Sequence, residues 1–229
     1  MGRHTLAGNP PIAVTLRRSA QARRLSLRVS RLDGRVSLTL PQWTPEREGV
    51  AFLQSKEAWL RKQLGGLAPS VQVQVGGTVM FAGQERPVLA QDRRGVRLTD
   101  AGIAVHAARP TGPQLRAFLR NAARDALVAA SDRHAAALGR PYTRITLRDT
   151  RSRWGSCTTD GALMYSWRLI MAPPEVLDYV AAHEVAHLAE MNHGPAFWRI
   201  VERLCPDHAR HRAWLRQNGD RLHRFTFGN

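Results

Sequence analysis

The sequence predicts an α+β fold, in which an antiparallel, β-rich N-terminal region with one helix precedes a C-terminal region that combines a short sheet with several helices. Three observations support this class. Apolar residues alternate with a period of two in short segments before residue 110, an alanine- and leucine-rich stretch without glycine or proline follows, and turn residues separate the segments. We therefore assign 1–110 and 111–229 to the two regions, which remain compatible with one continuous domain.

The N-terminal region contains strand-like segments followed by a helix. Period-two alternation marks three segments, at 12–16, 25–29 and 36–40. Asp33-Gly34 lies between the second and third of them and predicts a hairpin turn. Pro45 then opens a helical pattern that two glycines end at 65 and 66. Short apolar segments with glycines between them fill 71–107, where we expect small antiparallel structure.

The C-terminal region is mostly helical. The stretch 114–138 contains no glycine or proline and should form the longest helix. Two strand candidates follow, 144–147 and 162–169, joined by a polar loop over 148–161. Pro173-Pro174-Glu175 is typical of a helix start, and this helix is expected to continue as far as 192–194. Two further helices are predicted: one over 196–204, which Pro195 can start, and one at about 207–217.

Composition and charge limit the classes of partner. Hydrophobic residues make up 43% and charged residues 23% of the chain, which excludes wholesale disorder. The net charge is +16, and lysine occurs only at Lys56 and Lys62, so arginine carries nearly all the positive charge. Arginine binds phosphates and carboxylates, which makes non-specific nucleic-acid association a candidate property. The arginines are spread along the chain without a compact tail or stripe, and this favours a solvated basic surface.

The cysteine content and the apolar segments indicate a cytoplasmic chain. Only Cys157 and Cys205 occur, too few for a disulfide framework. The N-terminal residues do not resemble a secretory signal, and no apolar window reaches the roughly 20 residues needed to span a bilayer. We therefore expect a reducing, cytoplasmic setting and no membrane partner.

The segment HEVAH at 183–187 carries the clearest chemistry. His183 and His187 are four residues apart, so on a helix both imidazoles project from one face and can bind one ion. Glu184 lies about 100° round the helix, from where its carboxylate reaches a water on the metal. Zinc-dependent peptide hydrolysis needs two neutral nitrogen ligands and such a base. Surface histidines or a structural zinc are the alternatives; the apolar neighbours Val180 and Val185 argue against the surface interpretation.

The third ligand decides the kind of site. His193 follows His187 by six residues, the spacing of the metzincin class of zinc proteases, although metzincins carry glycine where this chain has Glu190. We favour His193, because histidine suits zinc well and a turn can hold it beside the helix. The alternatives for the third position are Glu190, Glu202, Asp207, His208 and His211.

Several residues near this motif are candidates for oxyanion or substrate contacts. Arg151 and Arg153 lie in a tight loop and could stabilise an oxyanion or bind a substrate carboxylate. Tyr165 is a candidate oxyanion donor, although an aromatic residue in a strand is more often packing. Trp154 is either the floor of a cleft or a core anchor. The strand around 164–169 leads toward the predicted metal helix, so an extended peptide could pair with its edge.

An ordered series of motifs resembles the YgjP-like metallopeptidases, a family related to the SprT-like and WLM-type zinc proteases. The series is RSRWGSC at 151–157, Trp167-Arg168-Leu169, Ala172-Pro173-Pro174-Glu175 with Tyr179, then HEVAHL and NHGPAFW. The resemblance implies a zincin-like C-terminal region with an active-site helix, Zn²⁺ ligation by His183, His187 and His193, and a general-base role for Glu184. This chain has Ser166 and Gly194 where members often have asparagine and serine.

The predicted function is a zinc-dependent hydrolase, specifically a metallopeptidase that acts on peptide or protein substrates. Glu184 would activate a zinc-bound water for attack on the peptide bond. The alternative from another class is a basic, nucleic-acid-associated binding protein with a structural zinc. A fourth protein ligand would favour this alternative, whereas an open coordination position would favour the enzyme.

Overall fold

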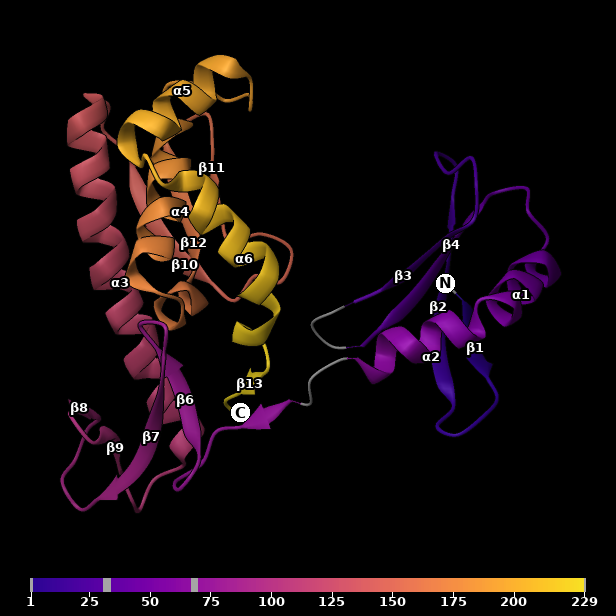
Figure 1. Cartoon of the computed structure of the whole chain (residues 1–229), viewed down its shortest axis with the longest axis horizontal. Coiled ribbons are helices and arrows are strands. Elements are labelled where there is room, and N and C mark those ends of the chain that lie inside the picture. The colour runs from indigo at the N-terminus through magenta and orange to yellow at the C-terminus, as the bar shows by residue number, and fades with distance from the viewer. Residues whose placement is uncertain (1, 31–33, 67–69, 229) are drawn as a thin grey trace. The chain divides into compact units, whose positions relative to one another are not determined.

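The computed structural model describes residues 2–30, 34–66 and 70–228, and its chain divides into two units, Met1–Pro69 and Ser70–Asn229 (Figure 1). The predicted α+β class is confirmed, since both units combine strands with helices. The division after residue 69 differs from the predicted boundary after residue 110, because the strands within 71–107 belong to the second unit.

The first unit is a four-stranded sheet with two helices. Its strands have the order β1-β2-β4-β3, with β2 and β4 parallel and the other pairs antiparallel. Alternate leucines, isoleucines and valines of β2 and β4 are buried together with Leu53 and Leu60 of the helices. The elements are β1 (Gly2–Leu6), β2 (Ile12–Ser19), β3 (Ser26–Val29), β4 (Val36–Pro41), α1 (Glu46–Ser55) and α2 (Glu57–Gly65).

Three details of this unit bear on the sequence predictions. The three predicted strands are present, and β3 and β4 pair antiparallel as a hairpin requires, although Asp33 of the predicted turn lies outside the described residues. The additional strand β1 pairs with β2 and was not predicted. The single predicted helix is two helices, because the chain leaves helical geometry at Lys56, where φ is −104° and ψ is 7°.

The second unit begins with a small sheet of order β6-β7-β9-β8. Its antiparallel pairs agree with the prediction, whereas β7 and β9 pair in parallel. The short strand β5 pairs with β13 near the C-terminus, which joins residues 71–72 to 225–226. The elements are β5 (Val71–Gln72), β6 (Thr78–Phe81), β7 (Gln84–Gln91), β8 (Arg97–Thr99), β9 (Gly102–His106) and β13 (Phe225–Thr226).

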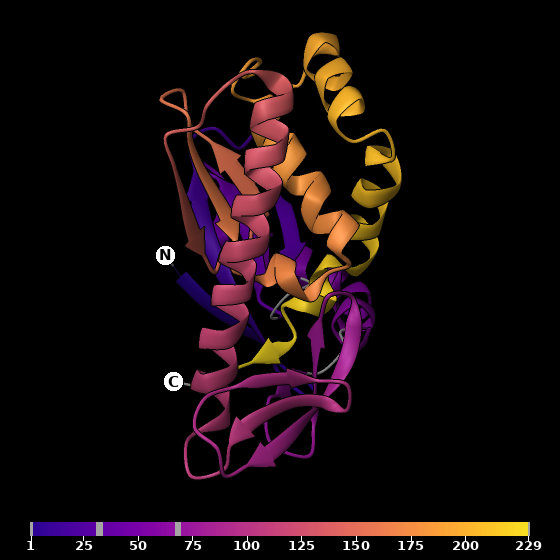
Figure 2. The ribbon, with the colours of Figure 1, turned by 90° about the vertical axis from the view of Figure 1, so that its left-hand side faces the viewer.

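The rest of the second unit carries the HEVAH segment. The longest helix, α3, runs along most of this unit in Figure 2 and ends at Gly139, whose φ of 70° suits glycine. The strands after it form a second sheet of order β10-β12-β11. The elements are α3 (Thr111–Leu138), β10 (Arg144–Arg148), β11 (Gly155–Cys157), β12 (Ala162–Ser166), the 3₁₀ helix η1 (Trp167–Met171), α4 (Pro174–Ala186), α5 (Pro195–Leu204) and α6 (His208–Leu222).

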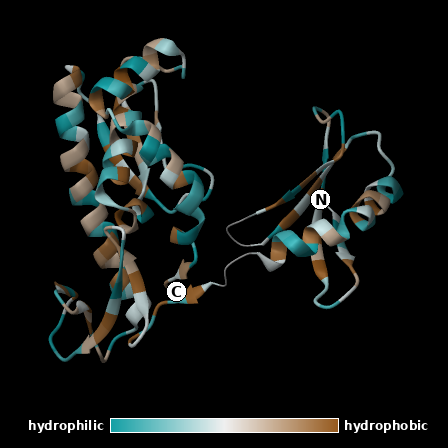
Figure 3. Ribbon diagram, in the orientation of Figure 1, coloured by the Kyte–Doolittle hydropathy of each residue, from teal (hydrophilic) through white to brown (hydrophobic). Residues whose placement is uncertain are grey.

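The hydrophobic core of the second unit is continuous from the first sheet to α4. It includes Val88 and Ile103 of the first sheet, Leu119 of α3 and Val180 of α4, and brown apolar segments mark these elements in Figure 3. Cys157 and Cys205 are both free thiols. Among the described residues, no helix is long and apolar enough to cross a membrane.

Candidate active site

The helix α4 lies in the middle of the second unit and presents the HEVAH segment. It begins at Pro174 as predicted, with Pro173 as its N-cap, and its residues are buried on almost every side. It ends at Ala186, so the expected continuation to 192–194 is wrong. The chain tightens into a turn there, because the amides of Leu188 and Ala189 bond to the carbonyls three residues before them.

Three histidines converge at this end of α4. The potential ligand nitrogens of His183, His187 and His193 all lie within 4.8 Å of one another. The Nε2 atoms of His183 and His193 are 3.1 Å apart. Two Zn–N bonds of about 2.0–2.1 Å at a tetrahedral angle would place their nitrogens roughly 3.3–3.4 Å apart, close to this spacing. The donor set and its geometry therefore suit zinc.

The other predicted candidates for the third position are not part of this cluster. Among the described residues, no side chain of Glu190, Glu202, Asp207, His208 or His211 joins the three histidines. Glu190 takes a different part: its backbone carbonyl accepts a hydrogen bond of 2.9 Å from Nδ1 of His187. This bond fixes the tautomer of His187 and leaves Nε2 free to bind a metal, a common arrangement around metal-ligating histidines.

The next helix, α5, supports the cluster from behind. It begins at Pro195, as predicted, and buries Phe197 completely. The Phe197 ring stacks on His187 at 4.5 Å between centroids and meets the edges of His183 and His193 at 4.9 and 4.7 Å. Because this rigid side chain touches all three imidazoles, it restricts their orientations.

The surroundings keep two of the imidazoles neutral, which is the form that binds a metal. Burial lowers the pKa of His183 to about 3, and the neighbouring positive groups add to this effect. Burial also lowers the pKa of His187, although its hydrogen bond to the Glu190 carbonyl opposes the change. Nδ1 of His183 is buried and has no hydrogen-bond partner among the described residues.

Glu184 is buried beside these histidines, at 6% exposure. Burial raises its pKa to about 8, and the charge of Arg153 opposes this rise. A divalent cation held by the histidines would act in the same direction as Arg153 and lower the pKa of Glu184. Burial of a carboxyl group is costly unless the group is paired or has a chemical role, and perturbed acids of this kind gather at functional sites.

Gly155 of β11 makes room for the Glu184 side chain. A Cβ at this position would lie 2.5 Å from both Cγ and Oε1 of Glu184. Real Cβ atoms do not approach other atoms so closely. Gly155 belongs to the RSRWGSC motif, and the space left by its missing side chain is the space that the carboxylate occupies.

A cavity of about 350 Å³ opens beside His183 and Glu184. Its lining combines the loop before β11, the middle of α4 and one face of α6: Arg153, Trp154, Gly155, Tyr179, Val180, His183, Glu184, Arg212, Leu215 and Arg216. Tyr179, Arg212 and Arg216 were not predicted as site residues. Tyr179 was visible only as part of the family motif, and the two arginines lie on the last helix, where nothing in the local pattern distinguishes them.

The structure separates the three candidates for oxyanion or substrate contacts. Arg153 lines the cavity, whereas Arg151 is exposed and is not among the lining residues. Tyr165 is completely buried, and its hydroxyl lies 3.0 Å from Oγ of Ser131 on α3. Burial raises the pKa of this hydroxyl. Tyr165 is therefore part of the core: its hydroxyl is paired with Ser131, and Tyr165 is not among the residues that line the cavity.

Trp154 combines both roles that the sequence left open. It lines the cavity, and its indole also packs on α6, where a Cβ at Gly219 would lie 2.9 Å from the ring. Its ring also lies 5.2 Å from that of His223, the C-cap residue of α6. Trp154 thus connects the loop before β11 to α6.

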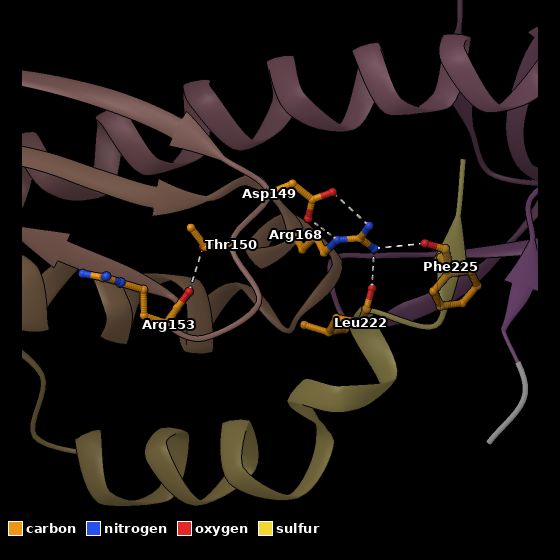
Figure 4. Close-up of polar contacts among 6 residues, drawn as sticks. All are labelled: Asp149, Thr150, Arg153, Arg168, Leu222 and Phe225. Atoms are coloured by element: carbon orange, nitrogen blue, oxygen red, sulfur yellow. Dashed lines mark hydrogen bonds and ion pairs between the residues drawn. The ribbon is translucent and has the colours of Figure 1, made fainter. Parts of the chain in front are cut away.

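A buried arginine, Arg168, holds the start of the same loop. Its guanidinium bonds to both oxygens of Asp149, at 2.6 and 3.1 Å, and to the carbonyls of Leu222 and Phe225, at 2.9 and 3.0 Å (Figure 4). In the same view Arg153 points away from this group, and its carbonyl accepts a hydrogen bond from the hydroxyl of Thr150. The loop is therefore fixed at one end while its arginine remains available to the cavity.

The strand expected at the edge of the sheet next to α4, around 164–169, lies in the middle of that sheet. β12 lies between β10 and β11, so the prediction that a peptide pairs with the edge of this strand is wrong. Within the described part of the chain, the outer side of β11 carries no strand partner. Its first residue is Gly155, beside Glu184. This unpaired edge is thus closer to the buried acid than the sequence suggested.

Comparisons with known proteins identify the family of this chain. No curated protein matches the chain. The crystal structure of the metallopeptidase zymogen of Pyrococcus abyssi abylysin matches with 20% identity and a TM-score of 0.36, over 39% of this chain and 93% of that one. The family model of the YgjP-like metallopeptidase domain matches residues 23–218, which is most of the chain. The chain therefore belongs to the YgjP-like metallopeptidase family.

Proposed function

We propose that the protein is a zinc-dependent peptidase with His183, His187 and His193 as the metal ligands and Glu184 as the general base. The observation that carries the proposal is the convergence of three imidazoles, within 4.8 Å, next to a buried carboxyl group at the wall of a cavity. A structural zinc needs a fourth protein ligand. The described residues add none to the three histidines, which favours a catalytic site.

The chemistry divides between the metal and the protein. When bound, zinc supplies a Lewis acid that polarises a carbonyl group and makes water acidic near neutral pH. The carboxylate of Glu184 accepts a proton from the attacking water and later donates it to the leaving amine. A pKa raised by burial suits both steps, because the group must hold the proton for part of the cycle.

The remaining residues orient the substrate and stabilise charge. Arg153 is the predicted oxyanion contact that lines the cavity, and its positive charge already acts on Glu184. The outer edge of β11 offers backbone donors and acceptors to an extended peptide. Phe197 keeps the imidazoles in place and excludes water from behind them.

The proposal is tested by measuring zinc content and hydrolysis of a set of fluorogenic peptides for the wild type, Glu184→Gln and His193→Ala. We expect Glu184→Gln to retain zinc and to lose at least about a hundredfold in kcat, the typical contribution of general acid–base catalysis. His193→Ala should lose zinc. Glu190→Gln is the matched control, because its side chain is outside the histidine cluster, and it should keep both zinc and activity. Hydrolysis by Glu184→Gln at the wild-type rate would refute the proposal.

A further inference from the structure

Two arginines of α6 face the same cavity as the proposed catalytic acid. Arg212 and Arg216 are exposed, and they lie four residues apart, so both project from one face of the helix. We propose that they form a carboxylate-binding subsite, which selects peptides that carry an acidic side chain or a free C-terminal carboxylate next to the scissile bond. This inference rests on the proposed peptidase function and names its substrate class.

The position of Arg212 is defined by an aromatic contact. Its guanidinium carbon lies 4.8 Å from the centre of the Trp198 ring, within the range of a cation–π interaction. Trp198 is the neighbour of Phe197 on α5, and its ring lies 6.1 Å from that of His193. The arginine is therefore held close to the histidine cluster by the same helix that supports the cluster.

The charge of the cavity is strongly positive. Its lining includes Arg153, Arg212 and Arg216, and Glu184 is the only carboxyl group among the lining residues. Within the described ranges, no ion pair joins any of these three arginines to a carboxylate. Two of these charges act on Tyr179, which also lines the cavity. Burial raises the pKa of the Tyr179 hydroxyl, and the positive charges of Arg212 and Arg216 oppose this rise.

The size of the cavity suits a peptide group. A volume of about 350 Å³ is at the small end of ligand sites, enough for one or two residues of an extended chain. A carboxylate there would meet guanidinium groups that offer bidentate, charge-assisted hydrogen bonds. A nucleic-acid backbone instead needs positive charges spread along a strip to neutralise successive phosphates. Convergence of the arginines in one cavity thus favours a single carboxylate.

Binding can be measured without hydrolysis, so the subsite is tested separately from the peptidase activity. We would use the zinc-loaded full chain carrying Glu184→Gln, and three peptides of one neutral sequence labelled with an uncharged BODIPY dye. The first has a central Glu and an amidated C-terminus, the second a central Gln and a free C-terminus, and the third a central Gln and an amidated C-terminus. Fluorescence anisotropy gives the Kd of each.

We expect the first or second peptide to bind at least about tenfold more tightly than the third, as a charge-assisted hydrogen bond provides. If the peptide with the central Glu binds more tightly, the subsite takes an acidic side chain. If the peptide with the free C-terminus binds more tightly, the subsite takes a terminal carboxylate. The double variant, which carries both Arg212→Gln and Arg216→Gln, should bring all three Kd values to within twofold of one another. Arg216→Gln alone should weaken the preference without touching the Trp198 contact. Arg210→Gln is the matched control on α6, outside the cavity lining, and should preserve the preference.

Two results would overturn the inference. One is equal affinity for the three peptides, whether or not a single-stranded oligonucleotide displaces them. The other is a carboxylate preference that survives in the double variant. Thermal unfolding of each variant shows that a lost preference is not lost folding. If wild-type protein cleaves no peptide while the carboxylate preference is present, the peptidase proposal fails and the binding site stands.

Discussion

A methyl group added at Gly155 should disable the site without removing the metal. In Gly155→Ala the new Cβ would lie 2.5 Å from Cγ and Oε1 of Glu184, whereas ordinary contacts begin at 3.4 Å. The carboxylate must therefore move by roughly 0.9 Å to restore a normal contact. Displacement of a reacting group by about 1 Å costs on the order of a hundredfold in rate, or about 2.7 kcal/mol of activation free energy.

The assay is steady-state hydrolysis of a fluorogenic peptide, together with zinc content and the Tm. We expect kcat of Gly155→Ala to fall about a hundredfold while zinc content stays at the wild-type level, because the three atoms nearest to the added group all belong to Glu184. Gly194→Ala is the matched control: it adds a methyl group at the residue after His193, and apart from the adjacent residues no atom lies within 4 Å of the new Cβ. A kcat for Gly155→Ala within threefold of the wild type would refute the view that this glycine positions the base.

Three further substitutions test the surroundings of the site. Arg168→Met removes four hydrogen bonds of a buried guanidinium and leaves the carbonyls of Leu222 and Phe225 without this donor, so it should lower the free energy of unfolding by about 2–5 kcal/mol in urea; a loss below 1 kcal/mol would contradict its anchoring role. Tyr165→Phe removes only the bond to Ser131, so it should cost about 1 kcal/mol of stability and leave kcat unchanged, whereas a tenfold fall in kcat would restore the oxyanion role. Burial raises the pKa of Asp178, but His134 and a neighbouring arginine overcome this and hold it below its usual range. The Tm difference between the wild type and Asp178→Asn should therefore be full above about pH 4 and should narrow as the pH falls through the folded-state pKa; a difference that stays constant or widens as the pH is lowered below about 4 would contradict this.

Local patterns were sufficient for most elements of the fold. Proline positions predicted the starts of α4 and α5, and the absence of glycine and proline predicted the long helix α3. The same signals failed at two places. The turn after Ala186 is stabilised by the local bond from His187 to the Glu190 carbonyl, and no residue in this stretch is a strong helix breaker. The parallel pairing of β7 with β9 joins segments that are separated in sequence, so it is decided by the tertiary structure.

The chemistry of the site was readable because it lies within eleven consecutive residues. His183, Glu184 and His187 occupy fixed positions on a helix of known geometry, so their spacing predicts which side chains meet. The third ligand was less certain, since the direction of the chain after a helix end depends on what packs around it.

The substrate-facing half of the site depends on contacts between segments far apart in the chain. Gly155 meets Glu184, and the arginines of α6 reach the same cavity, only because the second unit packs β11 and α6 against α4. Spacing along the sequence contains no information on such distances, whereas close packing of the core sets them to within a methyl group. Tyr165 shows the converse: its sequence context suggested an oxyanion donor, and the packing of α3 directs its hydroxyl to Ser131 instead.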